Sequence, residues 1–226
     1  MRHSGRGGVF PAVFACLVLL AGCDNRMWWE YRDDPYMADI AKKGEAEVLR
    51  GVNAAKPEER QMALRMLATR ASEARREGRP EEAREMETVI IRRYFVEKDQ
   101  VVRACIVRIC ATTVGRGSTA MVKFLRERIA AGEFPGYAAL SLASLGPRDA
   151  FLDIEPLARH PAPEVRYQAA EALAILGDPR GYEPVAKVWR SMQGSLWPDR
   201  IDGVPMPDAK RSLELRAMRV FGKPLT

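Results

Sequence analysis

The sequence predicts an all-α protein built as a solenoid of about five antiparallel helix pairs. Three observations support this prediction. Apolar residues recur at helical spacing along most of the chain, and no segment shows a convincing two-residue alternation typical of a β-strand. Related segments recur, and some of them lie 31 residues apart. Most of these copies end in a glycine, which is favoured just after the last turn of a helix.

The recurring segments are predicted to be the second helices of the pairs. The clearest copy, residues 162–178, aligns with 134–146 after a shift of 31 residues and with 56–68 after a shift of 106. Alanines in these copies allow a neighbouring helix to approach closely, and Leu173 and Leu176 are expected to be buried. The full set of copies is 56–68, 99–115, 134–146, 162–178 and 210–222.

The first helices of the pairs are expected between these copies. A lone helix pair cannot bury its apolar face, so successive pairs are expected to stack. The repeat domain is predicted to span residues 36–226, with an inserted loop at 191–208. The approximate ranges of the first helices are 36–50, 80–97, 118–131, 149–159 and 179–192.

The segment VRYQAAEALAILGDPRGYEPVAKVW, residues 165–189, resembles the HEAT-like repeats first grouped with phycobilisome lyases. It carries a Val-Arg pair, a run of alanines, Leu-Gly and then Asp-Pro-Arg in the order of that pattern. The other copies match less well, and 134–146 lacks the Val-Arg pair. The resemblance covers residues 36–222 and implies a right-handed α-α superhelix. Its implied role is binding and scaffolding, without a particular ligand.

Three arginines, Arg60, Arg103 and Arg166, recur near the starts of second helices. Such a row could hold anionic partners along the concave face of the solenoid. The favoured interpretation is a buried or half-buried ladder that joins neighbouring repeats, because recurring positions in repeat proteins usually serve stacking. Asp99 and Glu164 are the expected acceptors of this ladder.

The first 22 residues have the parts of a secretory signal peptide, with a basic start and an apolar run of 14 residues from Val9 to Gly22. This run is shorter than the roughly 20 residues that a membrane-spanning helix needs. The alternative is a buried core helix, but nothing amphipathic or capped follows the run.

The run ends in Leu20-Ala21-Gly22-Cys23, which resembles the lipobox of bacterial lipoproteins. The resemblance implies cleavage between Gly22 and Cys23 and a diacylglycerol on the Cys23 thiol. Two or three acyl chains anchor a protein stably, whereas one binds only marginally. The expected location is therefore a bacterial cell membrane, with the protein on its periplasmic or extracytoplasmic face. Asp24 resembles an inner-membrane retention signal, but the choice of inner or outer membrane stays open.

Residues 23–35 are predicted to form a short tether that is rich in aromatic residues, including Trp28 and Trp29. These rings either cap the first helix pair or rest at the membrane interface.

The charge balance and the cysteine content limit which partners and cofactors the chain is expected to bind. The chain carries 36 basic and 30 acidic residues, a formal charge of +6, and about +4 remains once Arg2 and Arg6 leave with the signal peptide. This balance indicates solvated helix surfaces, so no nucleic-acid partner is expected. Cys105 and Cys110 lie five residues apart in a predicted helix, a rise of about 7.5 Å that is beyond disulfide reach. Both are therefore predicted to be small buried apolar residues. A metal pair would lack partners, so no metal and no cofactor is predicted.

The inserted loop 191–208 contains the candidate partner-binding residues Trp197 and Arg200, and Trp197 is expected to be exposed. The alternative is a loop that folds back to shield the last helix pair. No catalytic residue is predicted, since His160 is the sole histidine after residue 22 and no hydrolase or phosphate-binding motif occurs.

The predicted function is a lipid-anchored envelope scaffold or adaptor that binds a protein or peptide. Two alternatives remain open: an enzyme or enzyme accessory subunit of the lyase-associated type, and a ligand-sensing module that uses the 191–208 loop.

Overall fold

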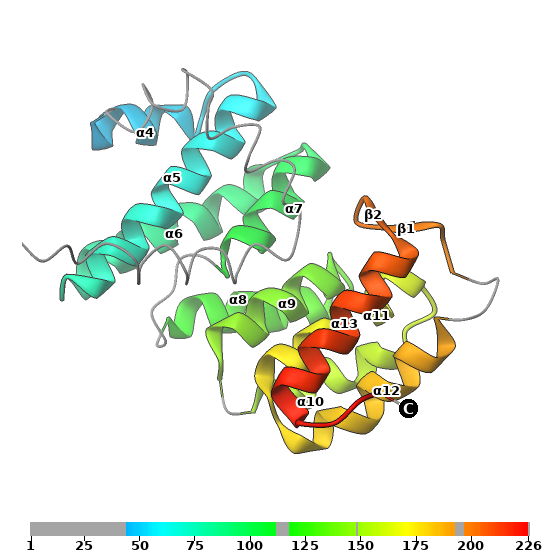
Figure 1. Ribbon diagram of the computed structural model, residues 1–226. Helices are drawn as coiled ribbons and strands as arrows, with labels where there is room; N and C mark the ends of the chain where they lie inside the picture. Colours follow the sequence, from blue (N-terminus) through cyan, green and yellow to red (C-terminus); the bar gives the residue numbers. More distant parts are fainter. Residues whose placement is uncertain (1–43, 112–117, 148, 193–196, 226) are drawn as a thin grey trace, which may run out of the picture.

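The computed structural model describes residues 44–111, 118–147, 149–192 and 197–225 (Figure 1). Nearly all of the elements in these ranges are helices, and they follow one another as antiparallel pairs, which confirms the predicted all-α repeat fold. The elements are α4 (Glu45–Gly51), α5 (Pro57–Arg76), α6 (Pro80–Val96), α7 (Gln100–Ile109), α8 (Thr119–Ala130), α9 (Pro135–Leu145), α10 (Ala150–Ile154), η1 (Glu155–Arg159), α11 (Pro163–Leu176), η2 (Pro179–Gly181), α12 (Tyr182–Ser191), β1 (Arg200–Ile201), β2 (Val204–Pro205) and α13 (Met206–Phe221).

Local sequence signals set where the second helices begin and end. Pro135 and Pro163 occupy the first helical positions of α9 and α11, where a missing N–H costs no hydrogen bond. Gly146, Gly177 and Gly222 follow α9, α11 and α13 in the left-handed conformation, with φ between 67° and 70°. The predicted glycine turns are thus confirmed at these three helix ends.

The predicted first helix at 149–159 differs from the structure. It consists of α10 followed by the 3₁₀ turn η1, because Pro156 cannot donate the backbone hydrogen bond that would continue an α-helix. The expected helix at 36–50 is described only from Glu45, where α4 begins.

The second helices α5, α7, α9, α11 and α13 pack side by side in chain order, and each of the first helices packs against one or more of them (Figure 1). Each second helix contributes a fully buried side chain to a continuous core, so stacking provides burial that one pair lacks. Leu173 is buried as predicted, but Leu176 in the last turn of α11 is only half-buried. Among the described residues, no helix combines the length and apolar character needed to cross a bilayer.

The inserted loop contains a small β-hairpin of two-residue strands, which the sequence analysis did not predict. In this hairpin Arg200 pairs with Pro205 and Ile201 pairs with Val204, antiparallel. The turn is Asp202-Gly203, with φ of 49° and 79°. Positive φ at both turn residues suits the twist of a two-residue hairpin, which is why Asp-Gly is a strong hairpin signal.

Candidate interaction surface

The hairpin docks against the second-helix layer through Asp202. The Tyr137 hydroxyl of α9 donates to Asp202 Oδ1 at 2.9 Å, and Gln168 Nε2 of α11 donates to Asp202 Oδ2 at 2.8 Å. Ile201 beside it is 1% exposed. Both oxygens of one carboxylate are therefore held by neutral donors from two adjacent repeats.

A glycine in α9 makes room for one of these donors. A Cβ placed on Gly136 would lie 1.8 Å from Gln168 Oε1 and 2.9 Å from Gln168 Cβ. Any larger residue would push Gln168 away, so the Asp202 contact depends on the close approach of α9 and α11.

Trp197 is not an exposed anchor, so this part of the sequence analysis is wrong. Its side chain is 9% exposed, and the Arg166 guanidinium lies 4.9 Å from its ring centroid. The reason is that the loop folds back onto the repeats, as the alternative interpretation held. Arg200 is exposed, and its Nε donates to the Gly203 carbonyl at 3.0 Å. A role of either residue in partner binding stays a prediction.

A ladder between neighbouring repeats is confirmed for Arg60 and Arg103 but not for Arg166, and its acceptors differ from those expected. Arg60 reaches Glu97 of the next pair with Nε at 2.8 Å, and Arg103 reaches Glu133 at 3.1 Å. Arg166 instead donates to the carbonyls of His160 and Pro161 and covers Trp197.

The acid Asp99 is not an acceptor of this ladder, because it caps α7 by accepting from the backbone N–H groups of Val101 and Val102. The three arginines therefore tie each of these second helices to a loop, and in two cases that loop belongs to the next pair.

Glu97 is the most strongly held acid of the ladder. Its side chain is 2% exposed, and Arg60 binds both of its oxygens while Arg93 binds one at 2.7 Å. Burial alone would raise the pKa of Glu97, but hydrogen bonds from Arg60, from the Asp99 backbone and from Arg93 outweigh it and lower the pKa to about 2. The carboxylate is thus charged and structural at neutral pH.

A second cluster, which the sequence analysis missed, surrounds Tyr94 at the junction of α6, α7 and α8. The Tyr94 hydroxyl donates to Glu133 at 2.8 Å, and the guanidinium carbons of Arg103 and Arg128 lie 4.4 Å and 5.1 Å from its ring centroid. Burial raises the pKa of Tyr94, and the Tyr94 hydrogen bond contributes most to lowering the pKa of Glu133. Tyr94 and Arg103 both bind Glu133, so the cluster is part of the contact between these neighbouring repeats.

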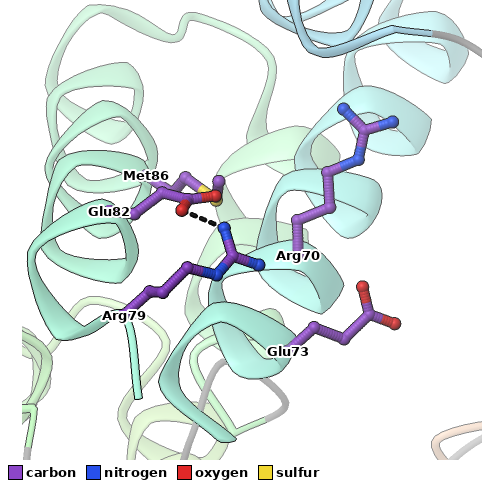
Figure 2. Close-up of a pocket in the computed structure, with 5 residues that line it drawn as sticks. All are labelled: Arg70, Glu73, Arg79, Glu82 and Met86. Carbon is purple, nitrogen blue, oxygen red and sulfur yellow. Dashed lines mark hydrogen bonds and ion pairs between the residues drawn. The ribbon is translucent and has the colours of Figure 1, made fainter. Parts of the chain in front are cut away.

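A shallow cleft of about 270 Å³ lies at the turn between α5 and α6 (Figure 2). Arg70 and Glu73 line it from α5, Arg79 from the turn, and Glu82 and Met86 from α6. Arg79 forms ion pairs with Glu82 and Glu77, so its charge is already neutralised by neighbours. This charged, internally paired lining is typical of a solvated surface and does not indicate a ligand-binding site.

The cysteines and the histidine have structural environments. Cys105 and Cys110 are buried, as predicted, and are not joined in a disulfide; burial raises the pKa of the Cys110 thiol. His160 Nδ1 accepts from the Ala162 backbone N–H at 3.1 Å, just before α11. Among the described residues, no group of three His, Cys, Asp or Glu side chains is placed to hold a metal ion.

The fold defines the class of protein: an α-helical repeat protein whose pairs share one core. Residues 130–195, from the end of α8 to just beyond α12, match the HEAT repeat family. No curated protein and no solved structure matches the chain. The predicted HEAT-like character is therefore supported for this segment. The predicted signal peptide 1–22, with its Gly22–Cys23 cleavage site, and the tether 23–35 lie outside the described residues.

Proposed function

We propose that this chain is a lipid-anchored scaffold of the bacterial cell envelope that binds a protein partner through its helical-repeat surface. The observation that carries the proposal is the HEAT repeat match over residues 130–195, within a stack that shares one continuous core. HEAT repeats typically form non-enzymatic scaffolds with extended binding surfaces. Attachment to the membrane is supported by the sequence around Cys23.

The surface chemistry agrees with a binding role. The buried charged groups of the described residues serve junctions between repeats, as Glu97 and Glu87 do with their arginines. Exposed side chains such as Arg200 remain available to a partner. Binding therefore needs no rearrangement of the core.

Anchoring is tested by metabolic labelling with palmitate and by membrane fractionation of the full chain. Cys23→Ala should abolish labelling and release the protein from the membrane or leave it uncleaved. Cys16→Ala is the matched control, because Cys16 lies inside the predicted signal peptide and should not affect the mature protein. Equal labelling of Cys23→Ala and the parent chain would contradict the anchor.

Partner binding is tested by crosslinking the full chain in its native membrane and identifying the captured proteins. The proposal expects a discrete protein that is lost when the repeat surface is altered, with Arg200→Ala as the first variant. Arg159→Ala is the control, since Arg159 is an exposed arginine of η1 on the first-helix side. Capture of no specific protein by the anchored chain would contradict the scaffold role.

A further inference from the structure

Three successive second helices place polar donors side by side. Arg108 belongs to α7, Tyr137 to α9 and Gln168 to α11. The Arg108 guanidinium carbon lies 5.2 Å from the Tyr137 ring centroid, and Tyr137 and Gln168 share the Asp202 carboxylate. We call these three residues the donor strip. It crosses three repeats, so it is suited to an extended segment that runs across the helices.

The donor strip is unevenly occupied. Tyr137 and Gln168 hold a carboxylate that belongs to the chain itself. Arg108 is half-buried, lies against the Tyr137 ring, and forms no ion pair with any residue that the structure describes. The Arg108 guanidinium adds a positive charge beside Tyr137 and Gln168, which already donate hydrogen bonds to a carboxylate. Because hydrogen bonds between ions are stronger than neutral ones, Arg108 would strengthen the binding of a carboxylate.

We propose that the donor strip binds an acidic peptide segment of the protein partner, and that Asp202 is the internal occupant of the same site. This inference rests on the proposed scaffold function and names the chemistry of its partner. A carboxylate of the partner replaces Asp202 at Tyr137 and Gln168, and a second one pairs with Arg108. The hairpin stays attached through the buried Ile201 and Trp197, so only its turn has to yield.

The test uses the full-length chain in detergent and a fluorescent hexaglutamate peptide, with binding followed by anisotropy at low salt. Hexaglutamine is the uncharged control peptide. Hexaglutamate should bind more tightly, and Arg108→Gln should weaken it about ten-fold, the effect of one lost charge-assisted hydrogen bond. Tyr137→Phe removes one donor and keeps the ring, so it should weaken binding without disturbing the Arg108 contact.

Asp202→Asn removes the competing internal carboxylate and should strengthen hexaglutamate binding. Asp199→Asn is its matched control, since Asp199 is an exposed acid of the same loop whose backbone carbonyl accepts from the Met206 N–H. Arg159→Gln controls for the loss of one positive charge. Helical circular dichroism and melting check that each variant folds.

Equal binding of the two peptides overturns the inference, as does an equal response to Asp202→Asn and Asp199→Asn. Crosslinking in the membrane separates this failure from failure of the scaffold function. A partner that is still captured by Arg108→Gln, and that hexaglutamate does not displace, overturns the donor strip and leaves the scaffold intact. Loss of that capture in Arg108→Gln but not in Arg159→Gln supports the donor strip.

Discussion

Two regions of this stack join their repeats by different means. Between α5 and α8 the junctions contain buried ion pairs: Arg60 with Glu97, and Arg75 with Glu87, which also accepts from Ser118 at 2.6 Å. Between α9 and α11 the helices meet through small residues and the close approach at Gly136. The fully buried alanines of this second region are Ala138, Ala139, Ala169, Ala170, Ala172 and Ala174.

The family match covers the second of these regions. Residues 130–195 carry the small-residue packing, whereas the ion-paired region before them falls outside the match although it has the same helix-pair architecture. One backbone plan therefore accommodates two kinds of junction. The ion-paired junctions depend on complete pairing, since a buried charge without its partner is costly. The small-residue junctions depend on shape.

The largest expected effect comes from breaking an ion-paired junction. Glu97→Ala leaves Arg60 and Arg93 without their carboxylate and should cost about 3–5 kcal/mol of unfolding free energy. Urea denaturation of the full chain in detergent measures this cost. Glu155→Ala is the control, because its partner Arg159 is exposed, and it should cost less than about 1 kcal/mol. Equal costs would mean that Glu97 is not a junction residue.

Acid should weaken the same junction gradually. The pKa of Glu97 is lowered from 4.5 to about 2, so its stabilisation is present above pH 4.5 and is lost as the pH falls towards 2. Urea midpoints between pH 7 and pH 2.5 should decline less steeply in Glu97→Gln than in the parent chain.

Asp178→Asn is the control for the pH series. Asp178 also has a pKa of about 2, caused chiefly by Arg180, but this pair is on the surface, and asparagine still caps η2. An equal flattening of the pH profile by both changes would mean that the buried Glu97 junction contributes no more acid sensitivity than a surface ion pair.

A smaller effect is expected from overfilling the small-residue junction. Gly136→Ala forces its new methyl group into Gln168 and should cost roughly 1–3 kcal/mol. Adding Gln168→Ser should recover part of this loss, because the shorter side chain vacates the space. Additive destabilisation in the double variant would show that the two residues do not share a packing constraint.

The smallest effect is expected at the exposed edge of the hairpin. Arg200→Ala should change the unfolding free energy by less than about 0.5 kcal/mol, because Arg200 is exposed and its hydrogen bond to Gly203 lies within its own turn. Trp197→Ala removes a buried ring from the same loop and should cost roughly 3–5 kcal/mol. Similar melting curves for the two variants would contradict the docked position of the loop.

Much of the fold follows from the sequence because its signals are local. Prolines at helix starts, glycines after helix ends and the apolar spacing together place the pairs within a few residues. The same kind of signal would have predicted the hairpin, since Asp202-Gly203 lies between the apolar residues Ile201 and Val204.

The contacts across repeats were harder to predict. Spacing identified Arg60 and Arg103 as ladder residues but could not choose Glu97 and Glu133 over nearer acids, because the choice depends on how neighbouring pairs are turned. The prediction that Trp197 is exposed was wrong for the same reason, since Arg166 covers its ring from a different helix. Local patterns determine helices, whereas partners across repeats depend on their packing.

The docked hairpin also changes how this chain should fold and unfold. In a linear array, each helix pair contacts only its neighbours, so the ends can fray one pair at a time. The hydrogen bond from Tyr137 to Asp202 joins residues that are 65 positions apart in the sequence. Helices α10, α11 and α12 lie between them along the chain. Closing such a long loop adds only a modest entropic cost, because that cost grows slowly with length. The third, fourth and fifth pairs are therefore expected to unfold as one cooperative unit, in which a helix two pairs away protects the carboxyl-terminal helix from fraying.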